Sequence, residues 1–229
     1  MPHRSIASPG AASMMKVWVV SHAYAAGVNH DKLRALAALP DVDLTVLAPR
    51  LWRTTLGDVR LPHHAGSYRL IPARVLLNGR VGGYLYLDGL VEMRRARPAV
   101  IHAELEPWSL AALECALAAP SARLVLFTWE NLGGPRRGWA RIIERLLLRR
   151  AAFVIAGNEA AQARLMWLGV MAERTARLPQ FGVDPARYGA GDAAAATARW
   201  RLRRPVVGYI GRLVPEKGVD LLPEPGSSD

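Results

Sequence analysis

The segment KVWVVSHAYAAGVNHDKLRALAALPDVDLTVLA, residues 16–48, contains the unit that decides the fold of this chain. Lys16 to Val20 is a short run of β-branched and aromatic residues, as expected for a buried strand. Asn29 is predicted to cap a helix over residues 29–39, which has a leucine-rich face. Asp43 to Ala48 then forms a second apolar strand. A strand, a helix and a strand in this order indicate a parallel sheet.

The same alternation continues along the chain. Further strands are predicted at residues 68–72, 100–103, 123–128, 153–156 and 175–178. Further helices are predicted at residues 83–96, 108–118, 137–150 and 159–168. This pattern predicts an α/β fold with a Rossmann-like, doubly wound parallel sheet, whose ligands bind at the carboxyl ends of the strands.

Shifts in composition divide the chain into four parts. The first part contains Pro, Gly and Ser without the apolar core of a secretory signal, so we expect it to be disordered. The third part, residues 184–204, has an alanine run and a basic cluster. The fourth part, residues 205–229, begins with an apolar strand, Val206 to Ile210, and a loop. The predicted parts are an extension (1–14), a Rossmann-like domain (15–183), a linker (184–204) and the incomplete start of a second Rossmann-like domain (205–229).

Composition narrows the classes of function. The chain has 229 residues, 51% of them hydrophobic, and a formal net charge of +11, which favours phosphate-bearing partners. Its one cysteine, Cys115, excludes an intrachain disulfide and fits a reducing cytoplasm. No apolar run is long enough to predict a membrane span. The sequence has no Gly-x-Gly-x-x-Gly after its first strand, no Walker loop and no recognised nucleic-acid motif. His63 and His64 have no third ligand at a useful spacing, so no metal is expected.

The most specific motif is VVGYIGRLVPEKGVD, residues 206–220. A glycine at the end of a strand lets a ligand approach the backbone, and Arg212 and Lys217 lie on a loop that leads to a helix N-terminus. Such a loop is suited to phosphate. The segment resembles the donor-phosphate loop of retaining GT-B glycosyltransferases, glycosyltransferase family 4 and its relatives, which have a strand, Gly-Arg and then Glu-Lys-Gly.

Other segments resemble this family in the same order. Leu178 to Tyr188 is similar to the segment between its two domains, and Ala99 to His102 to its strand ending in histidine. Ala151 to Gly157 is similar to its last strand before the linker, and Ser21 to Gly27 lies where the family has a glycine loop near the sugar phosphates. The resemblance covers residues 15–222 without a skipped segment.

The resemblance implies an activity. The complete enzyme would transfer a hexosyl group from a nucleotide-diphosphate sugar to an acceptor hydroxyl, with retention of configuration and with no metal or other cofactor. The acceptor would be a saccharide or a lipid-linked saccharide. The residues implied to act in catalysis are His102, Arg212 and Lys217, and those implied to bind the donor are Gly27, Gly211, Arg212, Glu216 and Lys217.

Acceptor binding is assigned to residues that follow strand ends: His22, Glu104, Glu106, Trp129, Glu130 and Asn131. Here the sequence departs from the family, which often has a histidine directly after the strand matched by Leu124 to Thr128. His102 and His22 therefore both remain candidates for the cleft histidine, and a hydrogen-bonded structural role is the alternative for each.

The family's acidic Glu-x7-Glu segment, which holds the donor, would lie beyond residue 229. We therefore expect this chain to be inactive alone. The alternative is a non-catalytic fragment that at most binds a nucleotide or a partner.

The predicted helix over residues 137–150 allows two interpretations. Its arginines recur every four residues, beside an apolar stripe. One interpretation is contact with anionic lipid headgroups at the inner face of the membrane. The other, which we favour, is a surface helix packed on the sheet of a cytoplasmic protein. Both hold if only the arginine side meets the membrane. The arginines are Arg137, Arg141, Arg145 and Arg149, and the apolar residues are Trp139, Ile142, Ile143, Leu146 and Leu147.

Overall fold

The computed structural model describes most of the chain, and the predicted N-terminal extension lies outside its described residues except for Met14. The described residues are 14–63, 66–131, 136, 138–189, 191–203, 206, 208–211, 213 and 217–221. The chain divides after Gly182 into two compact units.

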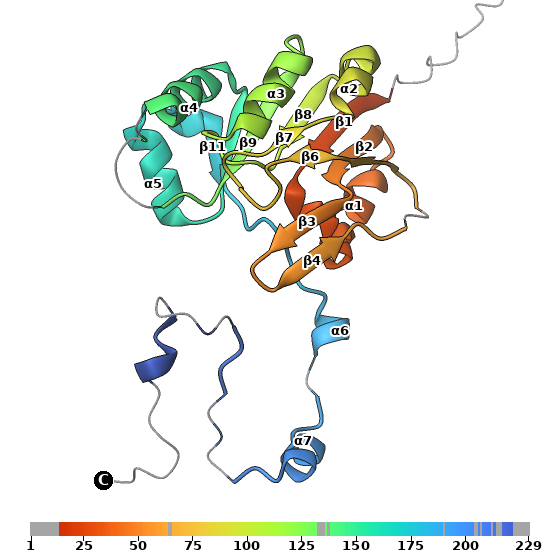
Figure 1. The fold of residues 1–229 in the computed structure, drawn as a ribbon, viewed down its shortest axis with the longest axis vertical. Helices are drawn as coiled ribbons and strands as arrows, with labels where there is room; N and C mark the ends of the chain where they lie inside the picture. Colours follow the sequence, from red (N-terminus) through yellow and green to blue (C-terminus); the bar gives the residue numbers. More distant parts are fainter. Residues whose placement is uncertain are drawn as a thin grey trace, which may run out of the picture. The chain divides into compact units, whose positions relative to one another are not determined.

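The first unit contains a seven-stranded sheet in the order β11-β10-β9-β8-β1-β2-β5, in which every pair of neighbours is parallel (Figure 1). The chain first builds outward from the interior strand β1 through β2 to β5. It then crosses back to β8, on the other side of β1, and adds β9, β10 and β11 in turn toward the other edge of the sheet. The strands are β1 (Met15–Val20), β2 (Val42–Pro49), β5 (Arg69–Ala73), β8 (Val100–Ala103), β9 (Arg123–Thr128), β10 (Phe153–Ala156) and β11 (Thr175–Arg177).

Alternating residues of β1 point to two different cores. Val19 packs in a cluster with Leu33 of helix α1, whereas Trp18 and Val20 belong to a larger cluster with residues of the helices that follow α1. The sheet is therefore covered on both faces, and the predicted Rossmann-like, doubly wound fold is confirmed. The helices are α1 (His30–Ala37), α2 (Leu90–Ala96), α3 (Leu110–Ala118), α4 (Gly138–Arg150) and α5 (Glu159–Trp167). Cys115 is completely buried on α3.

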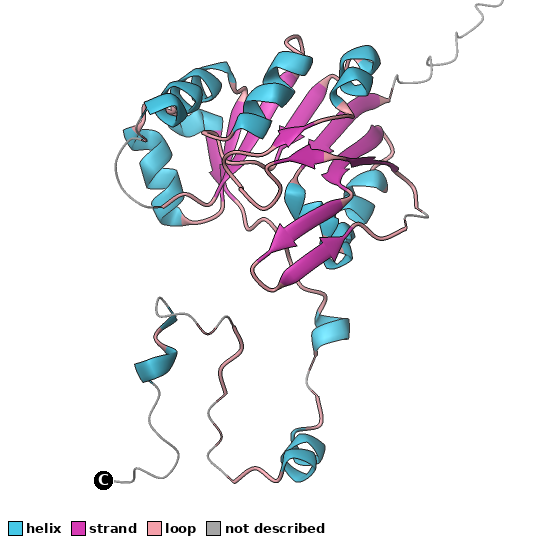
Figure 2. Cartoon of the chain, in the orientation of Figure 1, coloured by secondary structure: helices cyan, strands magenta, loops and turns pink. Residues whose placement is uncertain are grey.

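The first unit also contains two small antiparallel pairs, which the sequence analysis did not predict (Figure 2). The hairpin of β3 (Leu51–Thr54) and β4 (Gly57–Arg60) turns at residues 55–56, and Gly57, the first residue of β4, has a φ of 122° that disfavours other residues. The second pair joins β6 (Val75–Leu76) to β7 (Leu85–Tyr86).

Three predicted helix starts are wrong. The helix predicted from residue 83 begins at Leu90, because β7 occupies the preceding segment. The helix predicted from Trp108 begins after Ser109, whose hydroxyl accepts a hydrogen bond from the Ala112 amide. Asn29 does not cap α1, since its side-chain amide donates to the carbonyl of Ala23 instead, at 2.7 Å.

The second unit contains α6 (Pro185–Tyr188) and α7 (Ala193–Trp200), each begun by an aspartate that accepts hydrogen bonds from the first turn. A 3₁₀ turn follows at Val219–Leu221. The predicted strand Val206–Ile210 is wrong for the residues described there, because none of them belongs to a strand. A strand requires a hydrogen-bonded neighbour, and the described part of this unit offers none.

Among the described residues, no helix has both the length and the hydropathy that crossing a bilayer requires.

Candidate functional site

The strand order reverses between β1 and β8, and because these two neighbouring strands are parallel, the loops that follow them lie beside each other at the carboxyl edge of the sheet. In open α/β sheets this is where ligands bind. A pocket of about 180 Å³ opens there, and we call it the switch-point pocket. Its lining consists of His22, Ala23, Val81, Glu104, Leu105, Glu106, Phe127, Trp129 and Gln180.

Glu104, directly after β8, has a buried carboxylate with donors from three other segments. Its Oε1 accepts hydrogen bonds from Tyr24 Oη at 2.9 Å and from Lys32 Nζ at 2.5 Å. Its Oε2 accepts one from Gln180 Nε2 at 3.1 Å. Lys32 also donates to the Gln180 carbonyl. The ammonium compensates the buried negative charge, and the donors fix the orientation of the carboxylate.

Trp129 forms another wall of this pocket. Its indole Nε1 donates to Gln180 Oε1 at 2.9 Å, and its ring lies against Gly157, where an added Cβ would come within 2.5 Å of the ring. Glycine at this position therefore permits the close approach of the indole to the β10 end. Trp129 as a whole remains 45% exposed, so this residue is accessible to a ligand.

The second carboxylate, Glu106, is anchored to the end of β9. Thr128 Oγ1 donates to its Oε2 at 2.5 Å and the Trp129 amide to its Oε1 at 3.0 Å. Burial raises the pKa of the Glu106 carboxyl, and these two hydrogen bonds oppose the rise. Two oriented carboxyl groups in one small pocket are suited to accept hydrogen bonds from the hydroxyl groups of a ligand.

The two candidate histidines differ in position. His22 lines the pocket and packs against Trp52, with ring centroids 4.6 Å apart. Burial lowers its pKa to about 4, and its Nδ1 has no partner among the described residues. His102 lies in β8 with Nδ1 3.6 Å from Glu104 Oε1, it does not line the pocket, and burial lowers its pKa too. Both rings are therefore neutral near pH 7.

Three other predicted residues of this unit do not line the pocket. Glu130 forms an ion pair with Arg136, whose guanidinium stacks on Trp108 at 4.5 Å. Asn131 is exposed. A Cβ on Gly27 would meet Pro62 Cγ at 3.1 Å, so this glycine packs against the proline ring.

Apart from Gly27, which lies in the first unit, the predicted donor residues fall in the second unit. Gly211 and Lys217 are described there, and Arg212 and Glu216 lie outside the described residues.

The structure adds Tyr24, Lys32 and Gln180 to the site, which sequence reasoning missed. Lys32 is one of only three lysines, on the helix after the first strand, and this rarity was a usable signal. Gln180 lies inside the Leu178 to Tyr188 segment. Among the described residues, no group of three or more His, Cys, Asp or Glu side chains is arranged to hold a metal ion.

Comparison with known proteins agrees with the fold. The chain resembles Anabaena HepE in complex with UDP, with a TM-score of 0.60 and 17% identity, over 91% of this chain and 56% of the HepE chain. The UDP-glucose complex of HepE matches with a TM-score of 0.54, 17% identity and the same coverage. The chain thus spans little more than half the length of this structural relative. No curated protein sequence matches it.

A match to a family model shows the family to which the chain belongs. The model described as "Glycosyl transferase 4-like domain" matches residues 16–180, which include all of the seven-stranded sheet except Met15, and the switch-point pocket. The chain therefore belongs to the glycosyl transferase 4-like family.

Proposed function

We propose that the first unit is the acceptor-binding domain of a retaining, metal-independent glycosyltransferase that uses a nucleotide-diphosphate sugar. The observation that carries this proposal is the switch-point pocket, in which Glu104 and Glu106 are held by defined donors beside an exposed indole. Carboxylates accept hydrogen bonds from sugar hydroxyls, and an aromatic face packs against the apolar side of a sugar ring. The acceptor is a saccharide, free or linked to a lipid.

The histidines take different roles in this proposal. His22 faces the acceptor as a neutral hydrogen-bonding group, since its Nδ1 lacks a partner among the described residues and burial keeps it unprotonated. His102 supports Glu104 from beneath the pocket instead of contacting the ligand. Because its pKa is about 4, His22 suits hydrogen bonding better than proton donation near neutral pH.

The donor side of the proposal depends on the resemblance of residues 206–220 to the family's phosphate loop. Arg212 and Lys217 would bind the diphosphate, with Gly211 allowing its close approach. The positive charges would stabilise the departing diphosphate electrostatically. HepE has been solved with UDP and with UDP-glucose, so a uridine nucleotide is the first donor to test.

A thermal-shift titration of the whole chain with UDP, GDP, ADP and their sugar conjugates tests the donor assignment. We expect a saturable rise in Tm with one nucleotide, which Lys217→Ala weakens and Lys32→Ala does not. If a cooperatively folded chain shows no shift with any nucleotide, the donor assignment is wrong for this chain.

A second candidate function is binding without turnover. The observation that favours it is the lack of any strand among the described residues of 205–221, where the resemblance predicts the strand that leads into the phosphate loop. An assay of UDP release from UDP-glucose with saccharide acceptors separates the two candidates. Acceptor-dependent release by the purified chain would exclude this second candidate.

A further inference from the structure

Helix α4 has an outward row of arginines that have no partner among the residues described by the structure. Arg141, Arg145 and Arg149 recur every four residues and are exposed. Within the described part of the chain, none of the three forms a hydrogen bond or an ion pair. Three like charges on one side of a helix repel one another unless an anion binds between them. The row is therefore an electrostatic feature that the fold itself does not explain.

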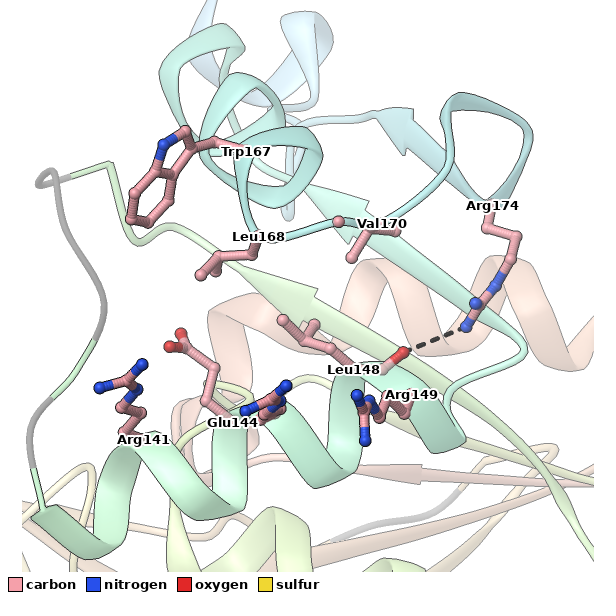
Figure 3. Close-up of a pocket in the computed structure, with 10 residues that line it drawn as sticks. Arg141, Glu144, Leu148, Arg149, Trp167, Leu168, Val170 and Arg174 are labelled. Atoms are coloured by element: carbon pink, nitrogen blue, oxygen red, sulfur yellow. Dashed lines mark hydrogen bonds between the residues drawn. The ribbon is translucent and has the colours of Figure 1, made fainter.

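A pocket lies beside this row, between α4 and the end of α5 (Figure 3). We call it the α4–α5 pocket. It has a volume of about 480 Å³, and its lining contains the three arginines, Glu144, Arg174 and the segment Trp167 to Val170.

Two of its charged side chains are already paired. Glu144 forms a buried ion pair with Arg164 at 2.8 Å. Arg174 donates to the carbonyls of Leu148 and Ala151 at the end of α4. Among the described residues that line the pocket, Arg141, Arg145 and Arg149 are the arginines with no hydrogen-bond or ion-pair partner, so the α4–α5 pocket is suited to an anion.

Apolar side chains flank the arginine row on both sides. On α4, Trp139, Ile142 and Leu146 are 53%, 66% and 54% exposed, although Ile143 and Leu147 of the same predicted stripe are buried. On the other side, Trp167 and Met171 are 63% and 58% exposed. The predicted stripe thus divides into a buried half that packs on the sheet and an outward half next to the arginines.

We propose that this surface, the arginine row with its apolar flanks, docks on an anionic phospholipid membrane. The arginine guanidiniums bind lipid phosphates, which match their paired donors, and they form the α4–α5 pocket for a headgroup. Tryptophan and aliphatic side chains at the same level enter the interfacial region of the bilayer. A nucleic acid would use the charges but would leave the apolar flanks in water. The proposal goes beyond the proposed function and does not depend on it, because docking requires neither nucleotide nor sugar.

Flotation with vesicles tests whether the charge of the arginine row binds an anionic membrane. The whole chain is mixed with vesicles of phosphatidylcholine alone, or of phosphatidylcholine with phosphatidylglycerol. We expect it to float only with the anionic vesicles. The triple variant R141Q/R145Q/R149Q should lower the partition coefficient on the order of 100-fold, about fivefold per arginine near an anionic surface. The matched control R94Q/R95Q/R123Q removes the same charge from exposed positions elsewhere on this unit. If the control loses as much binding as the α4 variant, net charge alone is responsible and the proposal is overturned.

Removal of exposed apolar side chains on α4 tests whether this surface inserts into the bilayer interface. In I142S/L146S all arginines are kept, and both substituted side chains are exposed, so the fold should persist. We expect weaker flotation and less quenching of tryptophan fluorescence by brominated lipids, and R94Q/R95Q/R123Q should keep the quenching of the wild-type chain. Unchanged quenching in I142S/L146S would contradict insertion of this surface.

Two further outcomes identify other occupants. Inorganic phosphate at constant ionic strength distinguishes a lipid surface from a free anion. One outcome is a saturable rise in Tm with phosphate that is lost in R141Q/R145Q/R149Q, without flotation of the wild-type chain. This outcome would overturn the proposal of membrane docking and would indicate a soluble phosphate ligand instead. Self-association that I142S/L146S abolishes, without flotation of the wild-type chain, would assign the surface to a second copy instead.

Discussion

The switch-point pocket and the α4–α5 pocket each contain a buried carboxylate paired with a cation, yet they suit opposite ligands. Glu104 pairs with Lys32 and has a second acid, Glu106, beside it in the lining. Glu144 pairs with Arg164 and is surrounded by further arginines. The first pocket is suited to accept hydrogen bonds from hydroxyl groups, and the second to bind an anion. The residues around the buried ion pair therefore decide which ligand each pocket suits, and the ion pair itself does not.

The largest expected effect concerns the Glu144–Arg164 pair. Glu144→Ala removes the carboxylate from a buried guanidinium and should cost about 3–5 kcal/mol of unfolding free energy. The double variant E144L/R164M replaces both charges with apolar groups of similar volume and should remain much closer to wild type. Chemical denaturation measures both. A double variant as unstable as Glu144→Ala would show that the pair contributes net stability.

The next effect depends on pH and concerns the other pocket. His22 has an ordinary pKa of about 6.5 when unfolded, and burial lowers it to about 4 in the fold. Between these values the unfolded state binds a proton that the folded state does not. Stability is therefore present above about pH 6.5 and declines by about 3 kcal/mol as the pH falls through 4. His22→Gln should flatten this part of the pH profile of unfolding free energy. The exposed control His63→Gln should keep the wild-type slope, and an equal change in both variants would contradict the assignment.

A smaller change in stability is expected for Glu104→Gln, which keeps the shape of the side chain but removes its charge. Lys32 loses its ion pair, and because its side chain is 24% exposed it can be rehydrated in part, so the cost should be about 1–2 kcal/mol. Saccharide binding, measured by calorimetry, should nevertheless fall at least about tenfold, since the carboxylate accepts hydrogen bonds more strongly than the amide. Glu159→Gln, at an exposed position outside the pocket, is the control. Unchanged saccharide affinity in Glu104→Gln would remove this residue from the site.

The smallest effect on stability is expected for Gly157→Ala. The new methyl group would come within 2.5 Å of the Trp129 ring, which is partly exposed and can move away at a cost of about 1 kcal/mol. The displaced indole changes the pocket wall without changing any charge, so saccharide affinity should fall while the Tm changes by only a few degrees. Gly182→Ala, where an added Cβ meets nothing within 4 Å, should change neither quantity. If Gly157→Ala binds saccharide normally, Trp129 is not a wall of the acceptor site.

The sequence was sufficient for the seven-stranded sheet because its innermost strands contain continuous apolar runs, as in Val17 to Val20 and Leu124 to Phe127, and because strands and helices alternate along the chain. The β3–β4 hairpin was missed because its strands are short, mostly exposed and polar. Val206 to Ile210 has the composition of a strand but lacks a neighbour among the described residues, and composition alone does not supply one.

The site was predictable where chemistry follows directly after a strand. His22, Glu104, Glu106 and Trp129 were found because loops at the carboxyl ends of parallel strands meet at one edge. Lys32 and Gln180 reach the same carboxylate from a helix and from the last loop of this unit, and such distant convergence has no local pattern.

Because Cys115 is completely buried, its reaction with a thiol reagent reports local unfolding of the interior. Burial raises the pKa of this thiol far above its ordinary value, so the nucleophilic thiolate is scarcely populated in the folded state. Since it is the only cysteine in the sequence, a thiol reagent can label the protein at one place, and only after α3 separates from its neighbours. The rate of labelling then measures how often this part of the interior becomes accessible, without any probe having to be engineered.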